Sequence, residues 1–439
     1  MQRRHFVRLA ALAASSASIP KSWRDLAHLR GAPAVNAARL NAHLQALRQF
    51  GKNEAGGISR VAYSAADLGA RDYARQLMRE AGLTVRTDAA GNIFGRRAGS
   101  DARATPILFG SHVDSVPDGG NYDGQVGSMG AIEVAHALKD AGVVTRHPLD
   151  VVIWQNEEGG TWGSHLVTSD PTDRELATVA TSGKTIREGI ALLEGNVEQL
   201  SAARLRSGSI HAYFELHIEQ GGLLDKAGIQ IGVVEGIVGL RQWEVTIQGV
   251  ANHAGTTPMP ERHDAMLAAA RFTEMVNRVV TSEAGRQVGT VGRIQAFPGA
   301  PNVIPGKVVC TLELRDLDDP KIERLFRSVQ REAQAIGVKN GTTFAFREFV
   351  THESALSDPR LRTIIGDAAR RLGFSTMSLP SGAGHDAQNL ARIGPMGMIF
   401  VPSVAGISHA PAEFSAPDAI ARGADVLLAT ILTADTTTF

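Results

Sequence analysis

Five side chains that can bind metal ions lie in glycine-rich or turn-like stretches, each near the end of an apolar run. They are His112, Asp123, Glu158, His217 and His409. Histidine and carboxylate groups are common ligands of divalent ions in hydrolytic enzymes. The densest part has Gly-Ser-His-Val-Asp at 110–114, an aspartate at 123 and two glutamates at 157–158. We interpret this spacing as a two-metal hydrolase site.

The carboxylates of this set suit different tasks. Asp114 lies two residues after His112 and could accept a hydrogen bond from its ring N–H, which would fix the tautomer that binds metal. The two oxygens of Asp123 could bridge two cations. Glu157 and Glu158 are adjacent, so one can bind metal while the other stays free as a general base. The pattern thus predicts a dinuclear centre with a base beside it.

Each of these features alone has an ordinary explanation. A His-x-Asp or Glu-Glu-Gly stretch is usually a set of solvated loop residues. A lone histidine such as His217 or His409 is more often a hydrogen-bonded polar residue than a ligand. The combined occurrence of these residues at predicted strand ends, in a chain with no net charge, favours the metal site.

The overall composition narrows the class of protein. A chain of 439 residues is too long for one compact core and favours two domains. Basic and acidic residues balance at 45 each, so no nucleic-acid partner is expected. The single cysteine, Cys310, rules out an internal disulfide and a cysteine-based zinc site. No apolar run approaches the ~20 residues of a membrane span, so no membrane anchor is expected.

The N-terminus has the features of an export signal. Two arginines at 3–4 precede a short apolar stretch over 9–17, and the small residues Ser15 and Ala17 could mark a cleavage site. Residues 1–17 therefore predict a twin-arginine signal and a periplasmic enzyme. The alternative is a basic, amphipathic start to a cytoplasmic enzyme.

Apolar runs with helices between them are expected to position the ligands. The runs that lead to the candidate residues are 107–109, 150–154, 212–216 and 396–401. Helical spacing of apolar residues is clear over 65–81 and 127–141. Nearly continuous apolar strands with intervening helices indicate an α/β fold with a mostly parallel sheet covered on both faces. Ligands collect beyond the carboxyl ends of such strands, where the candidate residues lie.

The segment from 240 to 351 has a different pattern. Its expected elements are strands over 242–248, 287–295, 307–315 and 342–349, and helices over 262–280 and 322–336. This β-α-β-β-α-β order is typical of a ferredoxin-like domain. Sheet-and-helix alternation resumes after it. We therefore expect an inserted lid or dimerisation domain between two parts of a catalytic domain, 36–239 and 352–439.

Several longer stretches resemble one known family. The chain is similar to the amidase hydantoinase/carbamoylase group of the M20 metallopeptidase superfamily, which includes N-carbamoyl-L-amino-acid hydrolase, β-ureidopropionase and allantoate amidohydrolase. The matching stretches occur in the family order over nearly the whole chain. They are GSHVDSVPDGGNYDG (110–124), NEEG (156–159), ELHIEQG (215–221), GVVEGIVG (232–239), ANHAGTTPM (251–259), PNVIP (301–305), LRD (314–316), SGAGHDA (381–387) and SHAPAE (408–413).

The resemblance implies a role for each matching residue. It places one metal ion at His112, Asp123 and His217, and the other at Asp123, Glu158 and His409. It makes Glu157 the general base of the reaction. Zinc is the expected metal, and manganese, cobalt or nickel are possible because histidine and carboxylate sites accept all four.

The resemblance also assigns residues to the substrate. His253, Asn302 and Arg315 would reach it from the smaller domain, and His253 could stabilise an oxyanion. Arg315 lies on the strand face opposite Leu312 and Leu314, free to bind a carboxylate. Gln220, Gly384 and His385 match further positions of the substrate pocket. The resemblance implies a homodimer in which smaller-domain residues complete the partner's site, and a closing movement of the two domains.

The implied activity is hydrolysis of the C–N bond of an N-carbamoyl (ureido) group, most readily of an N-carbamoyl-L-amino acid. A water held between the two metal ions would attack the ureido carbon, with Glu157 as base. The segment 159–162 reads Gly-Gly-Thr-Trp where relatives usually carry Gly-Ser-Arg-Phe, which leaves the substrate open. The alternatives are allantoate or another ureide, an aminopeptidase or deacylase reaction, and a non-catalytic periplasmic binding protein.

Overall fold

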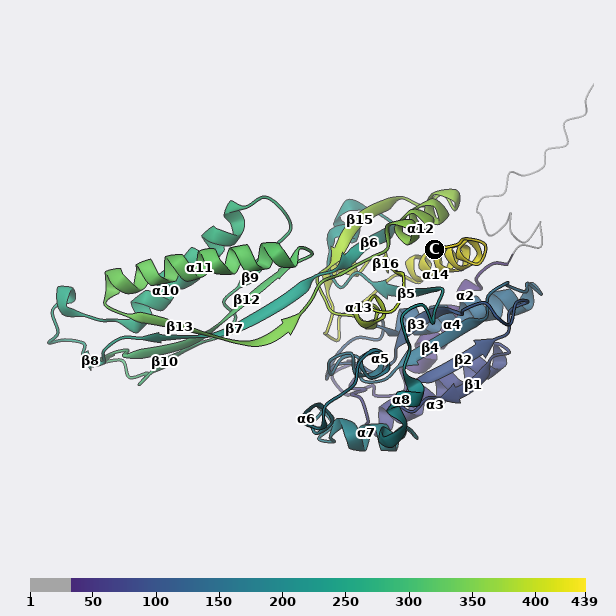
Figure 1. Ribbon diagram of the computed structural model, residues 1–439, viewed down its shortest axis with the longest axis horizontal. Helices are drawn as coiled ribbons and strands as arrows, with labels where there is room; N and C mark the ends of the chain where they lie inside the picture. Colours follow the sequence, from purple (N-terminus) through teal and green to yellow (C-terminus); the bar gives the residue numbers. More distant parts are fainter. Residues whose placement is uncertain (1–32) are drawn as a thin grey trace, which may run out of the picture.

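The computed structural model describes residues 33–439, which form two units joined side by side into an elongated molecule (Figure 1). The larger unit contains both ends of the described chain, and the smaller unit contains the segment between them. Each unit is built on a sheet of its own. The predicted export signal at 1–17 lies outside the described residues, so it stays a prediction.

The larger sheet has nine strands in the order β1-β2-β4-β3-β5-β16-β6-β14, with β15 beside β6. Pairs β3–β4, β3–β5, β5–β16 and β6–β15 are parallel, and pairs β1–β2, β2–β4, β6–β16 and β6–β14 are antiparallel. The predicted α/β fold with a mostly parallel sheet is confirmed. The strands are β1 (Thr84–Thr87), β2 (Ile93–Arg97), β3 (Ile107–His112), β4 (Leu149–Trp154), β5 (Ala212–Ile218), β6 (Ile231–Ile237), β14 (Ala355–Leu356), β15 (Thr376–Ser381) and β16 (Met396–Val401).

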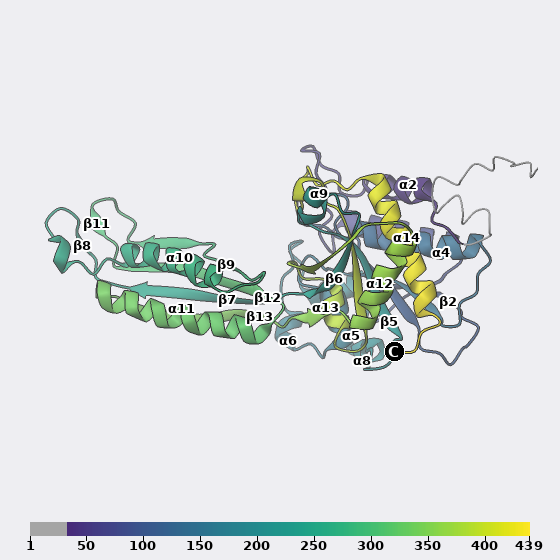
Figure 2. The ribbon, with the colours of Figure 1, turned by 90° about the horizontal axis from the view of Figure 1, so that it is seen from above.

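Helices cover both faces of this sheet, as the continuous apolar strands predict (Figure 2). On β3, Ile107 and Phe109 face one core while Leu108 faces the other, and all three are buried. The first core is closed by α2 (Ala37–Leu47), α3 (Ala65–Glu80), α4 (Gln125–Asp140), α12 (Pro359–Arg371) and α14 (Pro417–Ala434). The second is closed by α5 (Trp162–Thr168), α6 (Asp173–Leu176), α7 (Ile186–Leu192), α8 (Leu200–Ala203), α9 (Leu223–Ala227) and α13 (Asp386–Leu390), with short 3₁₀ turns η1 (Val197–Gln199) and η3 (Val404–Gly406) in the connections.

Two glycines allow the backbone to pack closely where β3 meets β4 and where α4 meets β5. A Cβ on Gly110 would lie 1.9 Å from the carbonyl oxygen of Val152, so β3 can lie tight against β4 only with glycine there. A Cβ on Gly127 would lie 2.1 Å from the carbonyl oxygen of Leu216, so α4 lies directly on β5. These contacts bring the ends of β3, β5 and α4 together at one edge of the sheet.

The smaller unit has the predicted β-α-β-β-α-β order with one difference. The strand expected over 287–295 is two short strands, β9 (Val288–Thr290) and β10 (Ile294–Phe297), which both pair with β12. Gly292 lies in the interruption, where it has no side chain to pack. The other elements are β7 (Gly239–Gln248), β8 (Asn252–His253), η2 (Met259–Glu261), α10 (Ala265–Ser282), β11 (Val303–Ile304), β12 (Lys307–Asp316), α11 (Asp319–Asn340) and β13 (Thr343–His352).

A third core holds the smaller unit together. Its antiparallel sheet runs in the order β10-β12-β7-β13, and α10 and α11 cover one face. The alternation on β7 is as predicted, since Trp243, Val245 and Ile247 are buried. Trp243 stacks on Phe326 of α11 with ring centroids 4.0 Å apart. The short pair β8–β11 lies at the end of the smaller unit that is far from the larger one (Figures 1 and 2).

Among the helices described over 33–439, none combines the length and the apolar character that crossing a membrane requires.

Candidate metal centre

The five predicted ligands meet at one edge of the larger sheet. His112 is the last residue of β3, and His217 is the penultimate residue of β5. Glu158 follows β4, His409 follows β16, and Asp123 lies two residues before the start of α4. Since β3, β4, β5 and β16 run parallel, their carboxyl ends deliver these side chains to the same place. The structure thus brings together residues up to almost 300 positions apart in the sequence.

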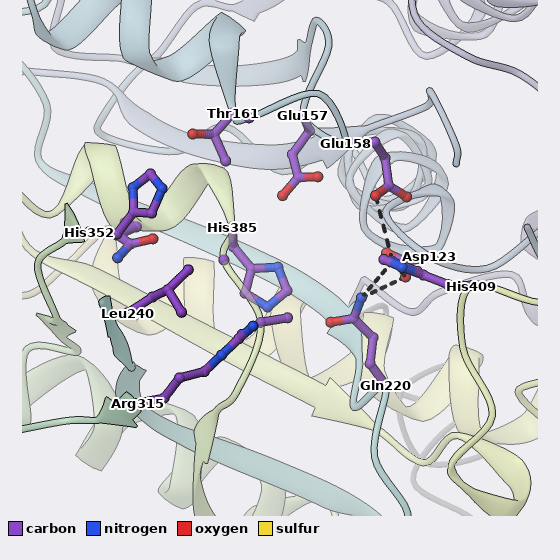
Figure 3. Close-up of a pocket in the computed structure, with 14 residues that line it drawn as sticks. Asp123, Glu157, Glu158, Thr161, Gln220, Leu240, Arg315, His352, His385 and His409 are labelled. Atoms are coloured by element: carbon purple, nitrogen blue, oxygen red, sulfur yellow. Dashed lines mark hydrogen bonds and ion pairs between the residues drawn. The ribbon is translucent and has the colours of Figure 1, made fainter. Parts of the chain in front are cut away.

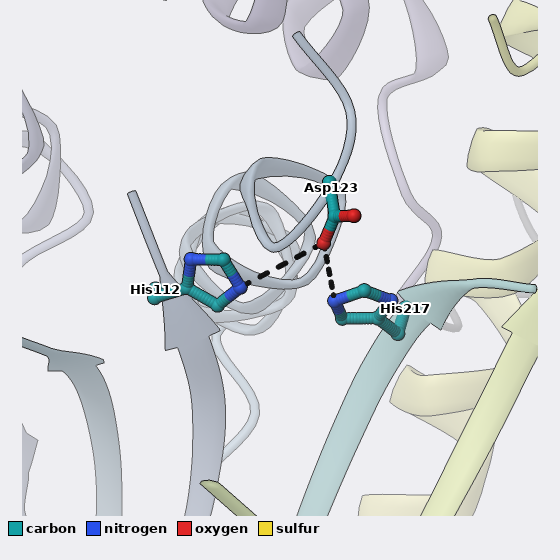
Figure 4. A group of neighbouring side chains, drawn as sticks. All are labelled: His112, Asp123 and His217. Atoms are coloured by element: carbon teal, nitrogen blue, oxygen red, sulfur yellow. Dashed lines mark ion pairs between the residues drawn. The ribbon is translucent and has the colours of Figure 1, made fainter. Parts of the chain in front are cut away.

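His112, Asp123 and His217 form the first cluster (Figure 4). Oδ1 of Asp123 lies 3.2 Å from Nε2 of His217 and 3.9 Å from Nε2 of His112. Nδ1 of each histidine faces a backbone carbonyl, that of Asp114 at 3.1 Å and that of Ile218 at 2.9 Å. A carbonyl can only accept, so Nδ1 of each ring carries a proton and Nε2 is the nitrogen that faces the cluster.

Asp123, Glu158 and His409 form the second cluster (Figure 3). Nε2 of His409 lies 3.2 Å from Oδ2 of Asp123 and 3.6 Å from Oε2 of Glu158. Asp123 therefore turns one oxygen to each cluster, as a carboxylate that bridges two cations must. His409 has a φ of 55°, in the left-handed region that a non-glycine residue adopts only where its surroundings hold it.

The donor atoms of these residues suit metal ions. In each cluster the three ligand atoms lie within 4.8 Å of one another. Nε2 of His112 and Oε1 of Glu158 are buried and have no hydrogen-bond partner within residues 33–439, although buried polar atoms are nearly always paired. Histidine nitrogens and carboxylate oxygens bind divalent transition ions. The residues are therefore able to bind metal ions and are arranged consistently with a two-metal site.

The charges of the cluster need cations to balance them. Burial raises the pKa of Glu157 well above its ordinary value, and the negative charges of neighbouring carboxylates raise it further. The pKa of Glu158 is raised in the same way, mainly by burial and then by Asp123 and Asp114. Burial lowers the pKa of His217, but the Asp123 carboxylate outweighs it and raises the value to about 9. Without metal, His217 therefore holds a proton at neutral pH, and a metal ion must displace that proton to bind.

The Asp114 carboxylate accepts hydrogen bonds from other groups than the sequence predicts. It was expected to accept the ring N–H of His112, but Oδ1 lies 3.6 Å from Nδ1, farther than the backbone carbonyl of the same residue. The carboxylate oxygens instead accept the backbone N–H groups of Glu157 at 3.3 Å and Glu158 at 3.1 Å. Two consecutive N–H groups at the end of β4 point toward the aspartate. Asp114 therefore orients the glutamate pair through its side chain and His112 through its backbone.

A cavity of about 330 Å³ opens beside both clusters. Four residues predicted to bind substrate line it, namely Gln220, Arg315, Gly384 and His385, together with Glu157. Gln220 donates a hydrogen bond of 2.6 Å to Oδ2 of Asp123. Arg315 enters from the smaller unit, with His385 between it and Glu157 (Figure 3). The cavity thus combines metal ligands, a free carboxyl and a guanidinium.

His253 and Asn302 lie away from this cavity. Both are exposed, and His253 belongs to β8 at the far end of the smaller unit (Figures 1 and 2). Its Nδ1 accepts backbone N–H groups from Gly255 at 3.0 Å and Thr256 at 3.1 Å, which leaves Nε2 directed to solvent. Neither residue lines the substrate cavity of its own subunit.

Sequence reasoning missed several residues of the site. Glu413 accepts hydrogen bonds from the N–H groups of Tyr122 and Asp123, at 3.0 and 3.1 Å, and from Ser408 at 2.9 Å. Glu413 therefore connects the loop that carries Asp123 to the loop that carries His409. The sequence signal that could have indicated this residue is its position four residues after His409. Leu240, His352 and Gln388 also line the cavity without a sequence signal, because only tertiary packing places them there. Gly160, Thr161 and Ala383 line it too, and they belong to the segments 159–162 and 381–387 that the sequence had already connected with the substrate.

Comparisons with known proteins agree with this geometry. Residues 108–433 match the model of peptidase family M20/M25/M40. The chain is 38% identical over 403 residues to the N-carbamoyl-L-amino acid amidohydrolase of Geobacillus stearothermophilus, covering 90% of this chain and 98% of that protein. It is 36% identical over 417 residues to the ureidoglycolate hydrolase of Arabidopsis thaliana, covering 92% and 88% of the two chains.

A solved structure shares the whole fold. The amidase of the hydantoinase/carbamoylase family from Burkholderia multivorans superposes with a TM-score of 0.84 at 37% identity, covering 93% of this chain and 100% of that chain. The similarity therefore includes both units and the connections between them. The chain belongs to peptidase family M20/M25/M40 and, within it, to the hydantoinase/carbamoylase amidohydrolases, which cleave carbon–nitrogen bonds other than peptide bonds.

Proposed function

We propose that the protein hydrolyses the carbamoyl group of N-carbamoyl-L-amino acids with the help of two divalent metal ions. The observation that carries the proposal is the composition of the cavity, which places the buried carboxyl of Glu157 beside both clusters and the guanidinium of Arg315 across from them (Figure 3). The relative from Geobacillus stearothermophilus acts on this class of substrate by name. A ureido acid has a carbonyl to place at the clusters and a carboxylate to place at Arg315.

The residues of this chain have separate roles in the proposed reaction. Bound at the two clusters, divalent ions would polarise the ureido carbonyl and make a water molecule more acidic. Glu157 accepts the proton of the attacking water and passes it to the leaving nitrogen. Burial raises the pKa of this carboxyl, which suits a group that must both accept a proton and give it up. The products are ammonia, carbon dioxide and the free amino acid.

Zinc is the proposed metal, with manganese, cobalt and nickel as the alternatives. Three histidine nitrogens and two carboxylates suit all four ions, so availability decides among them. Metal analysis of the purified protein, together with reconstitution of the metal-free form with each ion, tests this assignment.

The remote position of His253 and Asn302 supports a homodimer. Both residues could serve a substrate only if the smaller unit of one subunit reaches the cavity of its partner. Mixing two inactive variants tests this arrangement. In a mixed dimer of His253→Ala and Glu157→Ala, one of the two sites would hold an intact base and receive an intact histidine. Random mixing would then restore about a quarter of the wild-type activity, whereas sites completed within one subunit would restore none.

Allantoate or another ureide is the second candidate substrate. The ureidoglycolate hydrolase of Arabidopsis thaliana is nearly as similar to this chain as the carbamoyl amino acid hydrolase is. The segment with Gly160 and Thr161 borders the cavity, and Thr161 is held in the left-handed region with a φ of 53°. A β-branched residue rarely adopts this conformation, and such strained residues are frequent at ligand-binding sites. This supports a role of the segment in substrate choice.

The test of function is ammonia release by the metal-loaded protein. The panel contains N-carbamoyl-L- and D-amino acids, β-ureidopropionate, allantoate and ureidoglycolate, with Glu157→Ala as the control. Turnover of carbamoyl-L-amino acids that disappears in the variant supports the proposal, and preference for allantoate or ureidoglycolate supports the second candidate. If no ureido compound is turned over by protein with bound metal, the assignment is wrong.

Export to the periplasm through residues 1–17 is part of the same proposal, supported by the arginine pair and the apolar stretch. Cell fractionation of the full-length protein and of an Arg3→Lys, Arg4→Lys variant tests it. Retention of the variant in the cytoplasm is the expected result.

A further inference from the structure

Arg315 belongs to a short polar row on the uncovered face of the smaller sheet. Residues two apart in a strand lie on the same face, so Glu313 is the neighbour of Arg315 on β12. Gln242 of β7 is the direct cross-strand partner of Glu313. The opposite face of β12 carries the buried Leu312 and Leu314. The sheet therefore places Gln242, Glu313 and Arg315 in series, and only Arg315 reaches the substrate cavity.

Hydrogen bonds connect the three side chains. Nε2 of Gln242 donates to Oε2 of Glu313 over 2.6 Å, and Nε of Arg315 donates to Oε1 of Glu313 over 2.7 Å. Each oxygen of the glutamate is thus occupied by a different partner. Because Gln242 fixes one oxygen, the other is directed at the guanidinium. The carboxylate cannot turn away from Arg315 without losing the bond to Gln242.

A second contact holds the guanidinium from the larger unit. Nη1 of Arg315 donates to the backbone carbonyl of Gly382 over 2.6 Å. Gly382 precedes Ala383 and Gly384, which line the cavity. Nε and Nη1 of the guanidinium are therefore tied to a strand of the smaller unit and to a loop of the larger unit. Nη2 has no partner among the described residues, so its N–H groups remain available for a ligand.

The ion pair between Arg315 and Glu313 is partly buried, so solvent screens it less than an ion pair on the surface. The side chains of Arg315 and Glu313 are 29% and 24% exposed. Burial alone would raise the pKa of Glu313, but the hydrogen bonds from Arg315 and Gln242 outweigh it and lower the pKa, so the residue is a carboxylate at neutral pH. A long arginine side chain loses rotamer freedom when a ligand immobilises it. An arginine that is already held avoids most of that loss.

We infer that Glu313, fixed by Gln242, is a positioning residue that holds Arg315 ready for the carboxylate of the substrate. The inference rests on the proposed function, because it requires a substrate with a carboxylate opposite its ureido group. Glu313 itself touches neither the substrate nor the reacting atoms. Its removal therefore weakens carboxylate binding and leaves the chemical step unchanged.

The experiment measures ligand binding to metal-loaded protein in which Glu157→Ala blocks turnover. The ligands are N-carbamoyl-L-alanine and its carboxamide, which lacks the negative charge. Adding Glu313→Gln keeps the size of the side chain and removes its charge. The dissociation constant of the carboxylate ligand is expected to rise roughly tenfold, the effect of losing one charge-assisted hydrogen bond. That of the carboxamide is expected to change by less than about twofold.

Glu323→Gln is the matched control. Glu323 pairs with Arg241 over 2.9 Å in the same unit, with side chains 35% and 25% exposed, and neither residue lines the cavity. This variant removes a similar charge from a similar ion pair. It should leave the binding of both ligands unchanged. An equal loss in both variants would mean that the net charge of the smaller unit acts on the ligand, and would overturn the inference.

Removing the arginine provides the decisive comparison. If Glu313 acts through Arg315, then Glu313→Gln has no further effect in protein that already carries Arg315→Gln. Additive losses, or equal weakening of the carboxylate and carboxamide ligands, would show a general structural role and refute the inference. If the protein that carries only Glu157→Ala binds neither ligand, the proposed function is refuted instead. Kinetics in protein with Glu157 intact should show a raised KM and an unchanged kcat.

Discussion

Gly124 offers the sharpest test of how the fold shapes the metal site. It stands at the N-terminus of α4, one residue after Asp123, with φ 75° and ψ −40°. A Cβ built on Gly124 would lie 2.2 Å from Nε2 of His112, and 2.3 and 2.4 Å from two ring carbons. Nε2 is the nitrogen that faces the first cluster. The substitution Gly124→Ala therefore pushes directly against a proposed ligand.

The size of the effect follows from these distances. Ordinary contact between a methyl group and a ring requires about 3.5 Å, so the imidazole must withdraw by roughly 1 Å. Metal–ligand distances tolerate only about 0.2 Å. We expect Gly124→Ala to weaken metal binding by at least about 100-fold, more than the 10–100-fold typical of changes behind the ligands. The positive φ adds about 1–2 kcal/mol of destabilisation.

Gly142 provides the matched control at the other end of the same helix. It follows the C-terminus of α4 with a φ of 63°, and a Cβ there meets nothing within 4 Å. Gly142→Ala therefore also places a side chain at a positive φ, but without the clash. Metal content after dialysis against a buffered ion, together with thermal unfolding, separates the two effects. Full metal content in Gly124→Ala, or equal metal loss in both variants, would refute the reasoning.

Four further predictions concern the base, the metals, the smaller unit and the cysteine. Glu157→Gln should lower kcat by about 10²- to 10⁴-fold while metal content stays at the wild-type level, which metal analysis and kinetics check. A chelator should abolish activity and lower the Tm, because ions that bind only the folded protein stabilise it; an unchanged Tm with the metal removed would contradict this. Phe272→Ala, at a fully buried position of α10, should destabilise the smaller unit by about 3–5 kcal/mol in denaturant unfolding. Burial raises the pKa of Cys310 to about 11, so at pH 8 a maleimide should label the thiol only after unfolding; rapid labelling of the folded protein would show that β12 opens.

Residue patterns predicted the regular parts of the fold well. The apolar run at 396–401 corresponds to β16 over its full length, and alternation over 242–248 corresponds to the buried face of β7. Continuous apolar runs form strands that are buried on both faces, and strict alternation forms strands with one open face. The single strand expected over 287–295 was wrong, because periodicity does not reveal where Gly292 interrupts a strand.

The chemical class of the site was equally accessible, since it depends on which side chains follow strands. Each histidine or carboxylate alone has an ordinary explanation, but their combined occurrence after several strands indicates a metal site, and all five candidate ligands lie together in the structure. The detailed contacts were not accessible. Asp114 was paired with the ring of His112 by proximity in sequence, but its side chain points to the backbone of Glu157 and Glu158. Which of several nearby donors a carboxylate binds depends on backbone direction, and spacing does not contain that information.

Local sequence therefore determines which residues are able to do chemistry in this protein, because side-chain type and strand periodicity are local properties. Tertiary structure decides which of them share a cavity. Leu240 and His352 gave no signal of a site in the sequence, yet the junction of the two units places both in the wall of the substrate cavity, while His253 lies at the far end of the smaller unit. These placements depend on how two units, each with its own sheet and core, are joined. Only contacts between distant segments fix that arrangement, and no local pattern encodes it.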